Sequence, residues 1–347
     1  MAAKKTDDGA ALRQFRSDLK NGTLGRLYVF YGEEPYLREY YTGELCRRLI
    51  PEGLDAFNRI TLDGKTVTAE RLEEATDHLP MLCDRVLILV SDYDFYKASE
   101  EQRDRLTALF DQLPDTCCLV FLYDTVEYKP DNRMKKLRTA FLRYGQEVCF
   151  PRQGQKDLIP WITKHYAALG KQITAADAEY LLFLTGGSMH ILNAEIEKTS
   201  AYTKGKQVTR EALDAVVVPV LDAAVFALTD ALLARKYDQA AAVLADLLRL
   251  QEEPIVILAA IGRQVRQLYT ACILRESGRS ADQLTVIWSR MQPWMVRRLL
   301  EAARGCSAAW CRDAVILCAQ MDFEMKSGGD ARELLIALLP QLRQLAR

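Results

Sequence analysis

The residues best placed for chemistry follow the first long apolar run of the chain, at residues 26–31. A loop between a strand and a helix binds phosphates when it reads G-x-x-x-x-G-K-[ST], because its glycines let backbone amides converge on a phosphate that the lysine neutralises. Gly32 opens such a loop here. The positions of the second glycine, the lysine and the magnesium-binding hydroxyl hold Leu37, Arg38 and Glu39. The sequence therefore predicts a degenerate phosphate loop that binds no nucleotide and no other cofactor.

Acidic residues make the loop still less suited to a nucleotide. Glu33, Glu34 and Glu39 place carboxylates where phosphates would lie, which gives repulsion in place of attraction. After the third apolar run the chain has Ser91-Asp92, where an ATPase would present an acidic pair for the metal and the water. The opening glycine alone is equally expected at an ordinary turn of an unrelated α/β domain, and this alternative stays open at the level of the loop.

Other catalytic and metal-binding patterns are missing from the sequence. It contains no G-x-S-x-G, H-E-x-x-H, G-x-G-x-x-G or calcium-binding loop, so we expect no catalytic residues. The three histidines lie at no metal-ligand spacing from a cysteine, and there is no C-x-x-C pair. We therefore expect no metal site, and interpret most of the nine cysteines as small core residues.

Composition and charge exclude several further classes. A chain of 347 residues with 49% hydrophobic and 27% charged residues is typical of a globular protein with two or three domains. The net charge of -1 gives no overall attraction to nucleic acid. No apolar run reaches the ~18 residues of a membrane span, and the N-terminus lacks a secretory signal. We expect a cytoplasmic protein without a membrane partner.

The first part of the chain alternates between short apolar runs and helical stretches, which is typical of a parallel sheet covered on both faces. The helix predicted at Ser99–Leu113 begins with the capping-box pair Ser99 and Gln102. The predicted strands are Arg26–Tyr31, Phe57–Leu62, Val86–Val90, Cys117–Tyr123 and Glu147–Phe150. A doubly wound α/β domain is therefore expected.

Beyond Gln153 the strand signals stop and the rest of the chain is predicted to be helical. Short helices are expected up to about Pro219, with start signals at Asp157, Thr174, Ser188 and Thr209. From Leu221 to the end, long stretches with a 3.6-residue period predict a helical bundle. An apolar stripe there is either bundle core or subunit interface, and consists of Ile257, Ile261, Val265 and Leu268.

Several segments, in this order and at these spacings, resemble the DNA polymerase III delta subunit family of bacterial clamp loaders. They are VFYGEEPYLREYY (29–41), LPMLCDRVLILV (79–90), GGSMHILNAEIEK (186–198), EEPIVILAAIGRQVRQL (252–268) and MDFEMKSG (321–328). The resemblance implies α/β plus all-α architecture in three domains. These are an AAA+-like N-terminal domain at 1–151, a small helical lid at 152–219 and a helical collar at 220–347.

The resemblance also implies a function. A delta subunit binds the beta sliding clamp and opens it for loading onto primed DNA, in a ring of five with gamma/tau and delta-prime subunits. The polymerase activity belongs to the whole complex. Catalytic relatives typically carry a cysteine-rich zinc module and an S-R-C motif, and this chain has neither. It resembles the member that does not hydrolyse ATP.

In that family, a helix and a following hydrophobic wedge just before the third strand contact the clamp. The matching positions are Met81 and Leu82, after a helix expected at Ala69–His78. Two adjacent apolar side chains on a turn could fill a pocket of the clamp. The alternative is that the pair belongs to the core, where most Met-Leu pairs lie.

A basic stretch at 129–143 is a possible DNA contact, because clustered lysines and arginines bind phosphates. Its candidate residues are Lys129, Arg133, Lys135 and Lys136. A solvated helix face explains the same charges and is the interpretation we favour, and Phe141 is expected in the core. Two further functions stay open for the whole chain: an active ATPase, and a helical scaffold whose sheet domain is incidental.

Overall fold

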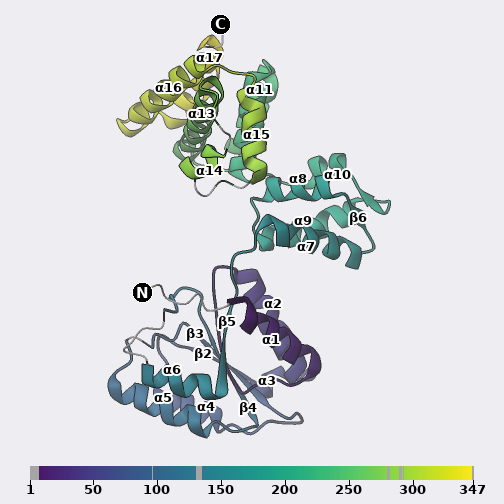
Figure 1. The fold of residues 1–347 in the computed structure, drawn as a ribbon, viewed down its shortest axis with the longest axis vertical. Coiled ribbons are helices and arrows are strands. Elements are labelled where there is room, and N and C mark those ends of the chain that lie inside the picture. The colour runs from purple at the N-terminus through teal and green to yellow at the C-terminus, as the bar shows by residue number, and fades with distance from the viewer. Residues whose placement is uncertain are drawn as a thin grey trace. The chain divides into compact units, whose positions relative to one another are not determined.

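The computed structural model describes residues 8–95, 97–129, 135–279, 282–288, 291 and 293–345 (Figure 1). The chain divides into two units, Met1–Gln153 and Gly154–Arg347. The expected boundary after residue 151 lies close to this division. Among the described residues no single helix is long and apolar enough to cross a membrane. One bent helix pair, α10 (Arg210–Val216) with α11 (Leu221–Leu233), has the length and composition of a membrane span only when both helices are counted together.

A five-stranded parallel sheet forms the centre of the first unit, in the order β2-β3-β4-β1-β5. The near-continuous apolar runs form buried strands because both faces of the sheet are covered. The strands are β1 (Leu27–Tyr31), β2 (Arg59–Asp63), β3 (Val86–Ser91), β4 (Cys117–Leu122) and β5 (Gly145–Cys149). They agree with the predicted strands to within two residues at every end.

Helices cover the sheet on both faces, which confirms the doubly wound α/β prediction (Figure 1). Alternate residues of β1 point to opposite faces. Tyr28 and Phe30 pack edge-on against Phe15 of α1, whereas Leu27 and Val29 belong to the core under the opposite helices. The helices are α1 (Asp8–Asn21), α2 (Pro35–Leu49), α3 (Asp55–Asn58), α4 (Ala69–Thr76), α5 (Glu100–Gln112) and α6 (Lys135–Tyr144).

Two local predictions for the first unit are confirmed. The Ser99 side chain accepts from the Gln102 amide at 3.2 Å, and the Gln102 side chain accepts from the Ser99 amide at 2.9 Å, which completes the capping box. Phe141 is 3% exposed and lies in the core with Phe110 and Leu137.

The second unit begins with four helices and a short sheet. Thr174 and Thr209 cap α8 and α10 with their side chains, as predicted, whereas Asp157 lies in the first turn of α7. The prediction that strands stop after Gln153 was wrong, because β6 (Gln172–Ile173) and β7 (Gln207–Val208) pair in parallel. Two-residue strands carry no detectable period. The helices are α7 (Gln155–Ala168), α8 (Ala175–Thr185), α9 (Met189–Tyr202) and α10.

The remaining helices form a bundle around α13 (Pro254–Glu276), which packs against α11, α15, α16 and α17. All four residues of the apolar stripe, from Ile257 to Leu268, are fully buried, so the stripe is bundle core. The separate lid and collar domains stay a prediction, because both lie in one unit. The other helices are α12 (Tyr237–Arg249), α14 (Gln283–Ile287), α15 (Pro293–Ala303), α16 (Ala308–Lys326) and α17 (Ala331–Leu345).

Candidate functional site

The degenerate phosphate loop is closed by contacts with its own chain. Gly32 has φ +125°, and a Cβ there would lie 2.3 Å from the carbonyl oxygen of Phe150. The Glu34 amide donates to that same oxygen at 3.0 Å. Pro35 then opens α2 at the first helical position, where a missing amide proton costs nothing. The loop therefore packs tightly against the chain that follows β5.

Arg38 fills the place where a phosphate-binding lysine would lie. Its side chain is buried and donates from Nη1 to the Gly32 carbonyl at 3.0 Å. Its other terminal nitrogen, Nη2, forms an ion pair with Asp124. Leu37 beside it is buried as well, whereas Glu39 is exposed. The guanidinium is thus already bound within the protein, and an incoming phosphate would have to displace these partners.

Asp92, which follows β3, organises the neighbouring loop. Its carboxylate accepts from the backbone amides of Asp124, Thr125 and Val126 at 2.8, 3.0 and 3.1 Å, and from the Thr125 hydroxyl. Burial raises the pKa of Asp92, but hydrogen bonds from the Thr125 hydroxyl and the three amides outweigh it and lower the pKa to about 2. An ATPase would use a carboxylate at this position to bind the metal ion and the water. Here the Asp92 carboxylate accepts hydrogen bonds from the loop at residues 124–126 instead.

These contacts form one continuous network across the site. Asp92 fixes the loop at 124–126, the loop presents Asp124 to Arg38, and Arg38 holds the Gly32 carbonyl. Lys65 adds a positive charge 3.8 Å from Asp92 and donates to Thr125 at 3.0 Å. The sequence indicated that nucleotide-binding residues are missing, but not that Asp124 and Lys65 take part in what replaces them.

The predicted wedge residues lie on the surface. Met81 is 49% exposed and Leu82 is 80% exposed, and Leu79 on the same turn is 76% exposed. The alternative that the pair belongs to the core is therefore wrong. Leu82 has φ +57°, a left-handed conformation that costs a residue with a Cβ roughly 1–2 kcal/mol. Such strain persists only where the surrounding structure fixes the turn.

Buried polar groups fix this turn from below. Asn58 is fully buried at the end of α3 and clamps Met81, accepting from its amide at 2.7 Å and donating to its carbonyl at 2.9 Å. Arg85 holds the chain between the turn and β3 by donating to the carbonyls of Leu24 and Gly25. The backbone is thus anchored while the apolar side chains face solvent. Asn58 carries no motif by which the sequence could have identified it.

The basic stretch is largely neutralised by acidic neighbours. Lys129 pairs with Glu127, and Lys136 pairs with Asp104 at 2.7 Å. Lys135 is exposed, and Arg133 lies outside the described residues. Ion pairs with internal acids favour a solvated helix face over a phosphate-binding surface. DNA contact by these residues stays a prediction.

The structure gathers three cysteines that the sequence kept apart. The sulfur atoms of Cys272, Cys306 and Cys311 lie 3.5 to 3.9 Å from one another in the second unit. Linear spacing missed them because two helices, α14 and α15, lie between Cys272 and the other two cysteines. Within the described part of the chain, this is the only group of three or more cysteine, histidine, aspartate or glutamate side chains that lie close enough together to hold one metal ion.

Comparison with known proteins assigns both units to one family. The family model of the DNA polymerase III delta subunit matches residues 28–143, and the model of the C-terminal domain of that subunit matches residues 222–340. The chain belongs to the DNA polymerase III delta subunit family. The resemblance stated from the sequence is confirmed.

Individual relatives agree with this assignment. The chain is 23% identical to DNA polymerase III subunit delta of Bacillus subtilis over 324 residues, which span 92% of this chain and 93% of the relative. It is also 23% identical to the probable delta subunit of Aquifex aeolicus, over 74% of each chain. The solved structure of the Bacillus subtilis DNA clamp loader delta protein covers 97% of this chain and 100% of that protein, with a TM-score of 0.59 and 22% identity, a likeness in fold. The AAA+-like α/β plus helical architecture is confirmed.

We expect Asp92→Ala to lower the free energy of unfolding by about 2–4 kcal/mol, because each buried donor left without a partner costs about 1–3 kcal/mol. Urea denaturation followed by circular dichroism measures the loss. The matched control is Asp115→Ala, since the Asp115 side chain is 91% exposed and its ion pair with Arg26 contributes at most about 1 kcal/mol. Equal losses in both variants would contradict the role of Asp92.

Wild type and Asp92→Ala also test how the contribution of Asp92 to stability depends on pH. The pKa of Asp92 is depressed in the folded state to about 2 from 3.8, so its contribution is present above pH 3.8 and is lost as the pH falls through about 2. The stability difference between wild type and Asp92→Ala should therefore narrow between about pH 4 and pH 2. A difference that is constant over this range would contradict the lowered pKa.

We expect Asn58→Ala to destabilise the first unit by about 2–4 kcal/mol, because Met81 loses both backbone partners and a cavity remains. Amide hydrogen exchange at Met81 should accelerate. The control is Met81→Ala/Leu82→Ala, which should change stability by less than about 1 kcal/mol because both side chains are on the surface. A double variant as unstable as Asn58→Ala would contradict the prediction that these two side chains contribute little to stability.

Proposed function

We propose that this chain is the clamp-loader subunit that binds the beta sliding clamp and opens it for loading onto primed DNA, without hydrolysing ATP itself. The observation that carries the proposal is the exposed apolar turn at residues 79–82, held on a rigid base in a chain of the delta family. Within the complex its partners are the gamma/tau and delta-prime subunits, and the complex acts in the cytoplasm.

The turn has the properties of a binding anchor. Met81 and Leu82 offer apolar surface: complete burial of an exposed side chain of this size contributes roughly 1.5 to 3 kcal/mol, and Met81, which is 49% exposed, offers about half of that range. Asn58 holds the backbone before any partner arrives, so little conformational entropy is lost on binding. Adjacent anchors that enter one pocket are typical of energetic hot spots.

Binding of this kind opens a ring only if the turn fits the open state better than the closed state. The subunit then shifts the equilibrium by the difference between its two affinities. A hundredfold preference, about 2.7 kcal/mol, would raise a minor open state about a hundredfold relative to the closed ring. No nucleotide chemistry within this chain is required for that step.

The closed nucleotide site supports a passive role toward ATP. Arg38 donates to the Gly32 carbonyl and forms an ion pair with Asp124, and the carboxylate of Asp92 accepts hydrogen bonds from backbone amides. ATP binding and hydrolysis then belong to other subunits of the complex.

The first experiment measures binding of the purified chain to the cognate sliding clamp without nucleotide. Met81→Ala/Leu82→Ala should bind at least about tenfold more weakly, a loss of ~1.4 kcal/mol. Leu142→Ala is the matched control, because Leu142 is as exposed as Met81 but lies on α6, and its affinity should equal that of wild type. Surface plasmon resonance with circular dichroism of each variant gives both affinity and foldedness.

Two results would contradict the proposal. Absence of binding by folded wild type would favour the helical scaffold, and an equal loss in Leu142→Ala would remove the specific role of the turn.

The isolated chain should show no saturable ATP binding up to millimolar concentration, because the site offers neither a free lysine nor a glycine cradle. Equilibrium dialysis with labelled ATP and magnesium measures this, with a catalytic clamp-loader ATPase as the positive control. A dissociation constant below about 100 µM, stronger than about -5.5 kcal/mol, would support the active ATPase instead.

A further inference from the structure

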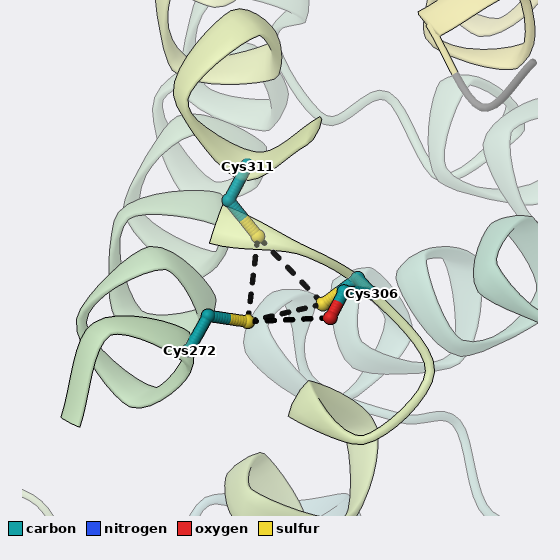
Figure 2. Close-up of side chains that lie close together, drawn as sticks. All are labelled: Cys272, Cys306 and Cys311. Atoms are coloured by element: carbon teal, nitrogen blue, oxygen red, sulfur yellow. Dashed lines mark hydrogen bonds between the residues drawn. The ribbon is translucent and has the colours of Figure 1, made fainter. Parts of the chain in front are cut away.

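The cysteine cluster lies where three segments of the second unit meet. Cys272 lies in the last turns of α13, Cys306 lies in the connection between α15 and α16, and Cys311 lies in the first turns of α16. Figure 2 shows their sulfur atoms pointing toward one another. All three cysteines are free of disulfide bonds. The arrangement joins the central helix of the bundle to the start of a helix that packs against it.

The size of the sulfur triangle matches a known coordination geometry. The Sγ–Sγ distances are 3.5 Å for Cys272–Cys306, 3.7 Å for Cys306–Cys311 and 3.9 Å for Cys272–Cys311. Ligands of a tetrahedral zinc ion with Zn–S bonds of about 2.3 Å lie about 3.8 Å apart. One zinc ion placed over the triangle would reach all three sulfurs with little movement of the chain.

We propose that Cys272, Cys306 and Cys311 bind one Zn²⁺ ion as thiolates and that the ion fastens α13 to the beginning of α16. Thiolates are soft ligands that select zinc over the hard ions magnesium and calcium. Within the described residues no histidine, aspartate, glutamate or fourth cysteine joins the group. A water molecule therefore completes the tetrahedron.

The surroundings of the three cysteines suit both a water ligand on the zinc ion and the net negative charge of the zinc–thiolate group. Cys272 and Cys311 are fully buried, whereas Cys306 is half-buried, so solvent reaches the ion from the side of Cys306. Three thiolates and Zn²⁺ leave one negative charge, which the guanidinium of Arg275 balances from its position on the carbonyls of Ala303 and Cys306. A cuprous ion would leave two negative charges in this largely buried place, which is less favourable.

The helix that carries Cys311 adds a further favourable field. Ser307 caps α16 by accepting from the Trp310 amide at 3.2 Å, so the positive end of the helix dipole lies beside the cluster. Helix N-termini stabilise thiolates.

Metal content of the full-length chain tests the proposal. The protein is purified in reducing buffer without chelator, and zinc is measured by plasma mass spectrometry. We expect about one zinc per chain in wild type and less than about 0.2 in Cys306→Ser, whose half-buried position tolerates the change. Cys318→Ser is the matched control, because Cys318 is buried on the same helix as Cys311 but outside the cluster, and it should keep the zinc.

Cobalt titration and thermal unfolding provide readouts that do not depend on metal acquired during expression. Co²⁺ added to the metal-free chain should give thiolate charge-transfer absorption in wild type and Cys318→Ser, and at least about a hundredfold weaker affinity in Cys306→Ser. Chelation should lower the melting temperature of wild type by several degrees and leave that of Cys306→Ser unchanged.

Three outcomes would overturn the site. They are a fully reduced wild type that contains no zinc and takes up no cobalt at micromolar concentration, equal metal content in Cys306→Ser and wild type, and a disulfide between two of the three cysteines in reducing buffer.

Discussion

The carboxylate of Asp92 is the interaction on which the N-terminal unit most depends. In a nucleotide-hydrolysing relative of this fold, an acid at the end of this strand serves metal and water. Here it accepts three backbone amides and a hydroxyl, and so fixes the loop that carries Asp124. Asp124 in turn holds Arg38 over the degenerate phosphate loop. The charged groups of Asp92, Asp124 and Arg38 are thus paired within the protein.

In our proposal the first unit binds no nucleotide and acts as a support for the clamp-binding turn. The turn at residues 79–82 uses that support, because Asn58 fixes its backbone and Leu82 adopts a left-handed conformation while its side chain lies in solvent. The two hydrogen bonds with Asn58 favour a single shape of the turn and help to offset the backbone strain at Leu82. In our proposal this preformed shape, rather than ATP, selects the conformation of the clamp.

The C-terminal unit depends on a different constraint, the complete burial of the apolar stripe of α13. Because neighbouring helices cover the apolar face of α13, residues that are distant in the sequence meet around its final turns. The cysteine cluster lies at that meeting point, and the proposed zinc ion would add metal–thiolate bonds to a bundle held by apolar packing.

The sequence by itself determined the parallel sheet, most of the helical remainder, the missing glycine and lysine of the phosphate loop and the family, because these depend on periodicity and on residues adjacent along the chain. It also predicted Met81 and Leu82 as a wedge on an exposed turn; the structure shows both side chains on the surface, and their contact with the clamp stays a prediction. Only the tertiary structure decided that Asn58 forms hydrogen bonds with the turn at Met81 and that Asp124 forms an ion pair with Arg38. It also decided that β6 pairs with β7 and that Cys272 lies beside Cys306 and Cys311. Each of these is a contact between residues far apart in the sequence, and no local pattern encodes which distant partner the fold will bring near.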